Sequence, residues 1–262
     1  MAPLRSASLG RVRGVFTDVD GTLTTDGVLR ASTLRVLEQL QKAGVPVVLV
    51  SGRPSGYAEA WLRMLPVEGA IAENGGLYLV RSRTGRLRKV YAQPRLVRAR
   101  ARQRLVRDVG AALRAVPGAR LSTDSLFSEV DLAVDYNEEV KLGVTAAKAL
   151  ESFLRRRGVQ AVRSSVHVNA WVGSFDKARM VRRFLRQEWG TRLRAKDSSF
   201  LYVGDSFNDA PLFASFHLSI GVANVRDVLE GLSTPPRYVT RGAEGRGFEE
   251  VARALLRQRA KR

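Results

Sequence analysis

Two carboxylates at the end of a short apolar stretch are the residues in this sequence best suited to chemistry. Asp18 and Asp20 follow Val15-Phe16 and are followed directly by Gly21 and Thr22. The apolar stretch predicts the end of a buried strand, the place where ligands bind in open α/β sheets. Two neighbouring acids repel each other unless a cation lies between them or their pKa values rise. A hard divalent ion is the natural partner, although Asp and Gly also favour ordinary turns.

Two further polar loops follow apolar runs, and a lysine lies between them in the sequence. One loop follows the apolar run 45–50, and the other follows the run 199–203. Each loop, and the lysine, is weak evidence for a site when taken alone, since such residues are common in turns and a single lysine is usually a surface residue. Together and in this order they indicate one site. Its residues are Ser51, Gly52, Arg53, Lys177, Asp205, Asn208 and Asp209.

The elements before residue 80 predict a parallel sheet that would bring these loops together. Apolar positions at helical spacing between Ser32 and Gly44 predict a helix that joins the first strand to the run 45–50. A continuous apolar run of this length is typical of a parallel strand buried on both faces. Strand, helix and strand then form a right-handed βαβ unit, which places Ser51 beside Asp18. A second helix over about 57–65 and a short strand lead to Glu73-Asn74-Gly75.

The pattern changes in the middle of the chain. Alternating residues around Thr84-Gly85 predict a hairpin, followed by helices over about 94–116 and 140–157 and by several short strands. This order is typical of an α+β module with antiparallel pairing. We therefore expect an α/β protein whose Rossmann-like parallel-sheet core comprises residues 1–80 and 172–262. Residues 81–171 would form an inserted α+β domain, which we call the cap.

The first pattern returns after the insertion. Ser174 could begin a helix that carries Lys177 and ends near Trp189. The run 199–203 predicts another buried strand, and shorter units follow it. We expect a flexible turn over residues 242–247 and a last helix over about 248–259.

Composition limits the class of protein. The chain has 262 residues, no cysteine and a formal net charge of +19. The absence of cysteine excludes disulfides and thiolate metal sites. There is no signal-peptide-like segment and no apolar run of ~18 residues, so we expect a cytoplasmic protein without a membrane partner. The densest arginine stretch, residues 95–107, has no interleaved aromatic residue for stacking on bases, so we favour a solvated helix face over a nucleic-acid site.

At this point the sequence resembles the haloacid dehalogenase-like phosphohydrolases. The motifs of that superfamily match the four groups above and span nearly the whole chain. An insertion between Ser51 and Lys177 resembles the larger α/β caps of the branch called class IIB. Thr22-Leu-Thr, Glu73-Asn-Gly and Asp176-Lys-Ala look closest to phosphoglycolate and mannosyl-3-phosphoglycerate phosphatases. Ala178 departs from the glycine that many members have after the lysine.

The resemblance implies a Mg²⁺-dependent phosphatase. Asp18 would be the nucleophile that forms an aspartyl-phosphate, and Asp20 would be the general acid and then the general base. Mg²⁺ would be held by Asp18, the main-chain carbonyl of Asp20 and Asp205, with Asp209 bound directly or through water. Lys177 would neutralise charge on the phosphoryl group. The remaining residues expected to contact substrate are Gly21, Thr22, Ser51, Gly52, Asn74 and Asn208.

The expected partner is a small anionic phosphate ester, such as a sugar phosphate or phosphoglycolate. Two alternatives stay open: a phosphomutase resembling phosphomannomutases, and a non-enzymatic basic protein that binds nucleic acid. In the cap, we expect His167 to be structural, Trp171 to pack at the domain junction, and Arg163 to face water or a substrate carboxylate. The sequence leaves the oligomeric state open.

Overall fold

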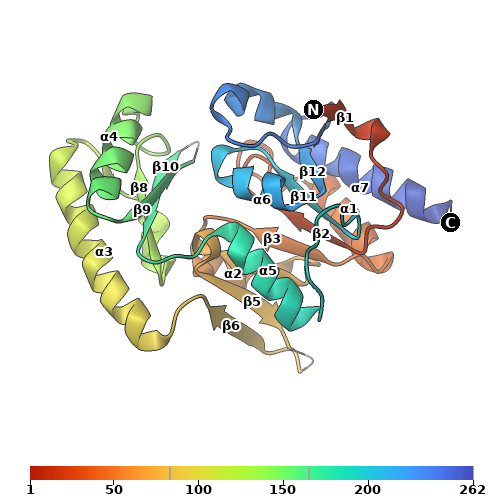
Figure 1. Ribbon diagram of the computed structural model, residues 1–262, viewed down its shortest axis with the longest axis horizontal. Coiled ribbons are helices and arrows are strands. Elements are labelled where there is room, and N and C mark those ends of the chain that lie inside the picture. Colours follow the sequence, from red (N-terminus) through yellow and green to blue (C-terminus); the bar gives the residue numbers. More distant parts are fainter. Residues whose placement is uncertain (83, 165, 262) are drawn as a thin grey trace.

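The computed structural model describes residues 1–82, 84–164 and 166–261 and shows two sheets of unequal size (Figure 1). Among these residues the larger sheet has nine strands, ordered β1-β13-β12-β11-β2-β3-β4-β5-β6. The strands from β1 to β4 in this order run parallel, and β5 and β6 are antiparallel additions at one edge. In sheet order, their bounds are Ala2–Pro3, Tyr238–Val239, Leu218–Gly221, Phe200–Gly204, Gly14–Thr17, Val47–Val50, Gly69–Ala72, Leu77–Arg81 and Leu87–Tyr91.

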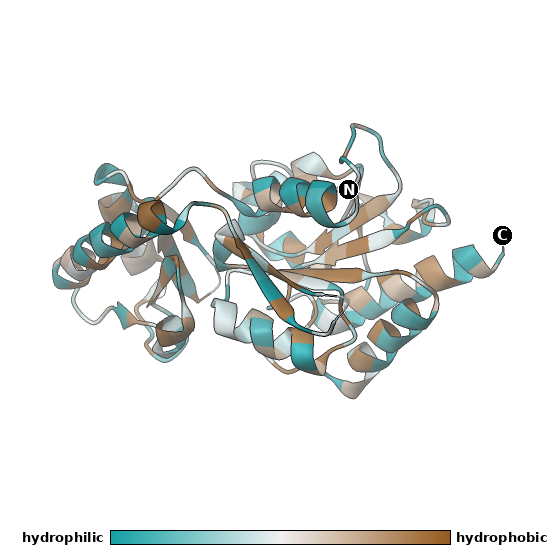
Figure 2. Cartoon of the chain, turned by 90° about the horizontal axis from the view of Figure 1, so that it is seen from below, coloured by the Kyte–Doolittle hydropathy of each residue, from teal (hydrophilic) through white to brown (hydrophobic). Residues whose placement is uncertain are grey.

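Helices cover both faces of this sheet because its central strands are apolar on both sides. In β3 all four residues are buried, with Val47 and Leu49 on one face and Val48 and Val50 on the other. The first face packs against α1 (Ala31–Lys42), α2 (Ser55–Met64) and α7 (Glu244–Ala260). The second packs against α5 (Lys177–Glu188) and α6 (Ala210–Ser215). Figure 2 shows the brown strands between helices whose outer sides are teal.

The second sheet has four antiparallel strands within the described residues, ordered β7-β8-β10-β9. Their bounds are Arg120–Leu121, Asp131–Asp135, His167–Trp171 and Gln160–Arg163. One face packs against α3 (Arg95–Ala115) and α4 (Gly143–Arg156) through a separate apolar cluster that includes Val134 and Val168. The residues between these positions, such as Ala133 and Asn169, face the other way and line a cavity at the larger sheet.

The α/β fold class that we expected is confirmed. The hairpin, however, continues the larger sheet, because β6 pairs with β5 along its whole length. Residues 87–91 therefore lie outside the smaller sheet, although we expected the cap to begin at residue 81. We propose that the cap begins after β6. The chain returns to the core at α5, whose N-cap is Asp176 and not Ser174.

The other differences concern helix ends. α7 begins at Glu244, so most of the expected turn over residues 242–247 is helical.

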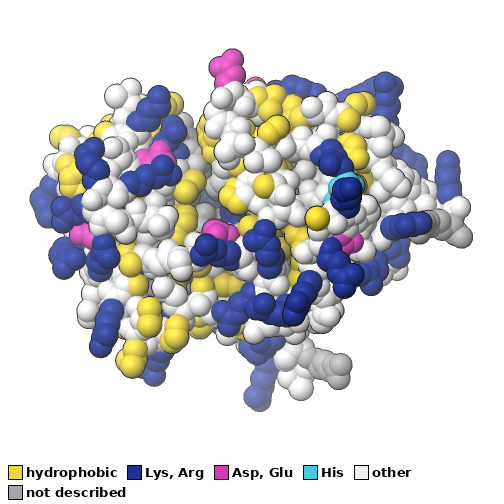
Figure 3. Space-filling view, in the orientation of Figure 1, with side chains coloured by type: hydrophobic (Ala, Val, Ile, Leu, Met, Phe, Trp, Pro, Cys, Tyr) yellow, Lys and Arg dark blue, Asp and Glu magenta, His cyan; other side chains and the backbone are white. Residues whose placement is uncertain are grey.

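Within the residues described, no helix combines the length and the apolar character needed to cross a bilayer. Dark blue side chains are spread over the face seen in Figure 3. In α3 several arginines are engaged within the protein: Arg104 contacts Asp108, and the Arg98 guanidinium lies over the Tyr91 ring.

Candidate active site

The first loop leaves β2 at the middle of the sheet and is tied to its neighbour β11. The Asp18 amide donates to the Val203 carbonyl at 2.8 Å, which holds the nearly buried Asp18 at the carboxyl end of both strands. Gly21 adopts a φ of +74°, and a Cβ there would lie 2.7 Å from the Asp205 carboxylate. The glycine therefore allows the loop to turn and the two acidic loops to approach each other.

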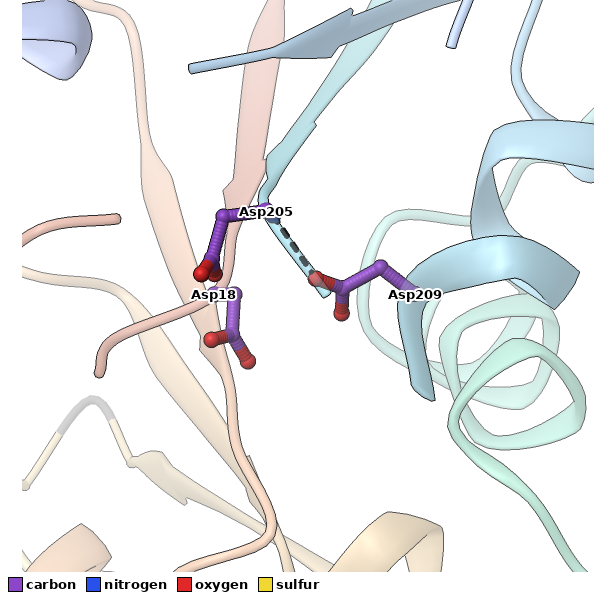
Figure 4. A group of neighbouring side chains, drawn as sticks. All are labelled: Asp18, Asp205 and Asp209. Atoms are coloured by element: carbon purple, nitrogen blue, oxygen red, sulfur yellow. Dashed lines mark hydrogen bonds between the residues drawn. The ribbon is translucent and has the colours of Figure 1, made fainter. Parts of the chain in front are cut away.

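Three carboxylates converge at this point, as Figure 4 shows. Asp18, Asp205 and Asp209 each offer an oxygen, and these oxygens lie within 4.8 Å of one another. Burial raises the pKa of Asp18 well above its ordinary value. Burial, followed by repulsion from Asp209, raises the pKa of Asp205 to about 7. Buried carboxylates that repel each other in this way fit a hard divalent cation with oxygen ligands.

Lys177 is the first residue of α5 and is almost fully buried. Its ammonium donates to Asp18 Oδ1 at 2.8 Å and to Asp209 Oδ1 at 3.1 Å. Burial alone would lower the pKa of this lysine, but the two carboxylates outweigh burial and raise it. The Asp176 side chain accepts from the Arg179 amide and fixes the helix end that carries the lysine. The ammonium is therefore a permanent positive charge beside Asp18.

Asp209 is fully buried and holds the third loop in shape. Its Oδ2 accepts from the amides of Asp205 and Ser206 at 2.9 and 3.1 Å. Its Oδ1 accepts from the Tyr202 hydroxyl as well as from Lys177. With both oxygens engaged in this way, the carboxylate has little capacity left for a direct ligand bond.

Thr22 lies behind the acidic cluster, although we expected it to contact substrate. It is fully buried, and its hydroxyl donates to Asp205 Oδ1 at 2.8 Å. The other Asp205 oxygen accepts from the Asn224 amide at 3.0 Å, and that amide also donates to the Gly21 carbonyl. Thr22 and Asn224 thus orient Asp205. The sequence analysis did not identify Asn224, which lies in a short 3₁₀ segment without a recognisable motif.

The second loop lies against the cap. Ser51 is buried, and its hydroxyl accepts from the Arg53 amide at 3.0 Å, which closes a tight turn around Gly52. A Cβ on Gly52 would lie 3.2 Å from Asn74 Oδ1. The Asn74 amide donates to Asp131 Oδ2 in the cap at 3.1 Å. Asn74 therefore connects this loop to β8.

Arg53 forms a polar contact between the core and the cap that involves three carboxylates. Its guanidinium binds the Asp20 carboxylate, with Nε 3.2 Å from both oxygens. It also binds Asp124 Oδ2 at 3.0 Å and Glu138 Oε1 at 3.2 Å, both in the cap. The sequence analysis included Arg53 in its motif but gave it no role, and it did not identify Asp124 or Glu138. Their contacts depend on how the two sheets meet.

These residues surround a narrow cavity of about 50 Å³ between the core and the cap. Of the expected site residues, those that line it are Asp18, Asp20, Ser51, Gly52, Asp205 and Asn208. Those that support it from behind are Gly21, Thr22, Asn74, Lys177 and Asp209. Asn208 is held by the Ser206 hydroxyl, which donates to its Oδ1 at 2.6 Å.

The three cap residues to which we gave expected roles have different positions. His167 lines the cavity, so its side chain lies at the candidate site. Trp171 stacks on Phe175 at 5.9 Å where the chain returns to the core, as expected for junction packing. Arg163 forms an ion pair with Glu151 inside the cap at 2.6 Å.

Comparisons with known proteins agree with this arrangement. The family model of haloacid dehalogenase-like hydrolases matches residues 15–94. A phosphoglycolate phosphatase of Halorubrum lacusprofundi is 33% identical over 209 residues, which is 79% of this chain and 82% of that protein. One of Methanopyrus kandleri is 25% identical over 246 residues, 93% of this chain and 97% of that protein.

Solved structures share the fold at low identity. A protein of Thermoplasma acidophilum has a TM-score of 0.72 at 18% identity, covering 94% of this chain and 98% of its own. The sucrose-phosphatase of Synechocystis has a TM-score of 0.66 at 16% identity, with the same coverage. A subclass IIB sugar phosphatase has a TM-score of 0.64. The chain thus belongs to the haloacid dehalogenase-like hydrolase family and is one of its phosphatases.

Proposed function

We propose that this phosphatase hydrolyses a small phosphorylated metabolite in a Mg²⁺-dependent reaction that passes through an aspartyl-phosphate on Asp18. One observation carries the proposal: Asp18 directly follows the central strand β2, lines the cavity and accepts a hydrogen bond from the buried Lys177 ammonium. A carboxylate can attack an anionic phosphate only where nearby positive charge offsets their repulsion. The buried ammonium supplies part of that charge.

The residues around Asp18 fit a magnesium ion. Carboxylate and carbonyl oxygens are the ligands that Mg²⁺ prefers in proteins, and the cluster offers them from two loops. Asp18, Asp205 and the main-chain carbonyl of Asp20 would hold the ion. Asp209 would act through the loop that it shapes and through Lys177. When bound, the ion supplies positive charge that screens the nucleophile from the phosphate.

The protein groups then have distinct tasks. An Asp18 oxygen attacks phosphorus while the bond to the ester oxygen breaks, and Asp20 gives its proton to that leaving oxygen. In the second step the Asp20 carboxylate takes a proton from water, which attacks phosphorus and releases Asp18 and inorganic phosphate. Ser51 and the Gly52 amide would bind the phosphate oxygens from the cavity wall. Arg53, which binds Asp20, would orient this acid and base.

The substrate would be a small ester such as a sugar phosphate, phosphoglycolate or a mannosyl-3-phosphoglycerate-like compound. The relatives named phosphoglycolate phosphatase and the neighbours named sugar phosphatases support this range. The narrow cavity between core and cap also favours small molecules, since both domains contribute to its walls.

The test is phosphate release from a panel of small phosphate esters, measured with Mg²⁺ and with a chelator. Asp18→Asn should abolish release, while Asp26→Asn, at an exposed acid of the following turn, should leave it unchanged. Release that continues in Asp18→Asn would refute the nucleophile. A wild-type protein that releases no phosphate but interconverts sugar phosphates would be a mutase.

A further inference from the structure

We propose that the cap side of the cavity selects an uncharged, hydroxylated leaving group and disfavours one that carries a carboxylate. This inference rests on the proposed function, because it concerns the part of the ester that faces away from Asp18. It distinguishes between the substrate classes that the relatives' names leave open. The argument depends on the charges and the free hydrogen-bonding groups of the residues that line the cavity.

The cavity has little free positive charge for a substrate carboxylate. Arg53 is the only lysine or arginine among the described residues that line it. Its guanidinium already binds three carboxylates, those of Asp20, Asp124 and Glu138. Even with Asp20 protonated as the general acid, one positive charge faces the carboxylates of Asp124 and Glu138, so this half of the site is net negative. Lys177 is engaged by Asp18 and Asp209 on the other side.

The cap holds these carboxylates in place. The Ser122 hydroxyl donates to Asp124 Oδ1 at 2.5 Å, and Asp124 itself is nearly buried. Glu138 Oε2 lies 2.7 Å from His167 Nε2, a buried nitrogen that makes no well-formed hydrogen bond within the described chain. A substrate carboxylate at Arg53 would have to displace these groups or lie beside them. Like charges placed together in this way are unfavourable.

The same wall offers hydrogen-bonding groups that suit hydroxyls. Asn169 is buried on β10 and lines the cavity, and its side-chain amide has no hydrogen-bond partner in the parts of the chain that the structure describes. Because this residue lines the cavity, its amide is available to a ligand. A hydroxyl can donate to Asp124 and accept from Asn169, whereas a carboxylate can only accept. The wall is therefore chemically matched to a polyol or sugar.

The experiment compares two esters that differ in one group, 2-phosphoglycolate and 2-hydroxyethyl phosphate, with glycerol 3-phosphate as a larger polyol. We expect kcat/KM for 2-hydroxyethyl phosphate to exceed that for phosphoglycolate by about tenfold or more. Asp124→Asn and Glu138→Gln should each narrow this ratio by increasing the relative rate with phosphoglycolate. Glu139→Gln, at the exposed neighbour that contacts Thr123, should leave the ratio unchanged.

The opposite result would overturn the inference. If wild type prefers phosphoglycolate and Arg53→Gln removes that preference, then Arg53 receives a substrate carboxylate. Failure of the proposed function has a different signature, namely that no ester releases phosphate. In that case the binding of the two esters to Asp18→Asn, measured by calorimetry, still decides the inference, because tighter binding of phosphoglycolate would contradict it.

Discussion

The Lys177 ammonium donates to the Asp18 carboxylate at 2.8 Å, although 159 positions separate the two residues in the sequence. The inserted cap lies between them along the chain, so this contact joins the first strand of the site to the helix that follows the insertion. Both groups are buried, and Asp209 is the second partner of the ammonium. Removing one member of such a group leaves an uncompensated buried charge.

The first prediction concerns this ammonium. Lys177→Met should lower kcat by about a hundredfold or more, because the phosphoryl group and Asp18 lose a fixed positive charge. It should also reduce the free energy of unfolding by about 3 kcal/mol, since Asp18 and Asp209 lose their shared partner. Phosphate release and denaturant unfolding measure the two effects. Arg186→Met, at an exposed position of the same helix, is the control. If Lys177→Met releases phosphate as fast as this control, the role assigned to Lys177 is excluded.

The second prediction concerns the support of Asp209. Tyr202 is fully buried, and its hydroxyl donates to Asp209 Oδ1 at 2.5 Å. Tyr202→Phe should therefore cost about 1–2 kcal/mol of stability and reduce activity only several-fold, because the acidic cluster remains. Thermal unfolding and phosphate release are the measurements, with Tyr238→Phe on the short strand β13 as the control. A fully stable Tyr202→Phe protein would contradict this role.

The third prediction concerns pH and magnesium. In the metal-free protein, burial and Asp209 raise the pKa of Asp205 to about 7, whereas an unfolded Asp titrates near ~3.9. The folded state therefore binds the proton more tightly, and this carboxyl's contribution to stability is lost as pH rises from about 4 to about 7. A cation binds the deprotonated form. Mg²⁺ should thus raise Tm more at about pH 8 than at about pH 5.5.

Differential scanning fluorimetry with Mg²⁺ and with a chelator, at both pH values, measures this effect. In Asp205→Asn the pH-dependent part of the Tm increase should shrink, because the carboxyl that titrates is absent. An equal Mg²⁺-induced increase at both pH values in the wild-type protein would show that Asp205 is not a ligand.

Much of the fold could be predicted because each central strand has a local signal. The runs ending at Phe16, Val50 and Val203 are apolar on both faces, which is typical of buried parallel strands. Because each of these strands is followed by a polar loop, we could also predict that the acidic residues lie close together. The beginning of α7 was missed because Gly245 and Gly247 are poor helix formers, but their small size permits close contacts with the loops at Thr25 and Thr240.

The contacts of individual site residues could not be predicted in the same way. Nothing near Thr22 in the sequence indicates that its hydroxyl points to Asp205, because that direction depends on packing between two loops. The three partners of Arg53 lie 33, 71 and 85 positions away, and two of them belong to the cap. Such contacts depend on how the two sheets and their loops meet, and they have no periodicity in the sequence.

The last prediction concerns Glu73, which fixes the cap to the core. Its buried carboxylate accepts from the amides of Glu129, Val130 and Asp131 in the cap at 2.6–3.1 Å. It also accepts from the Ser55 amide of the core at 2.9 Å. The residue has a φ of 51°, a left-handed conformation that costs free energy unless such contacts offset it.

Glu73→Gln should weaken this junction because one carboxylate oxygen is replaced by an NH₂ group. That group is a donor and would face backbone N–H groups that are also donors. We expect a loss of roughly 2–3 kcal/mol of stability and an increase in KM larger than the decrease in kcat. We expect this split because the wall that we propose for the leaving group belongs to the cap, whereas Asp18 and Lys177 belong to the core. Glu68→Gln, at an exposed acid just before β4, is the matched control. Unchanged stability and KM in Glu73→Gln would show that the cap is held by other contacts.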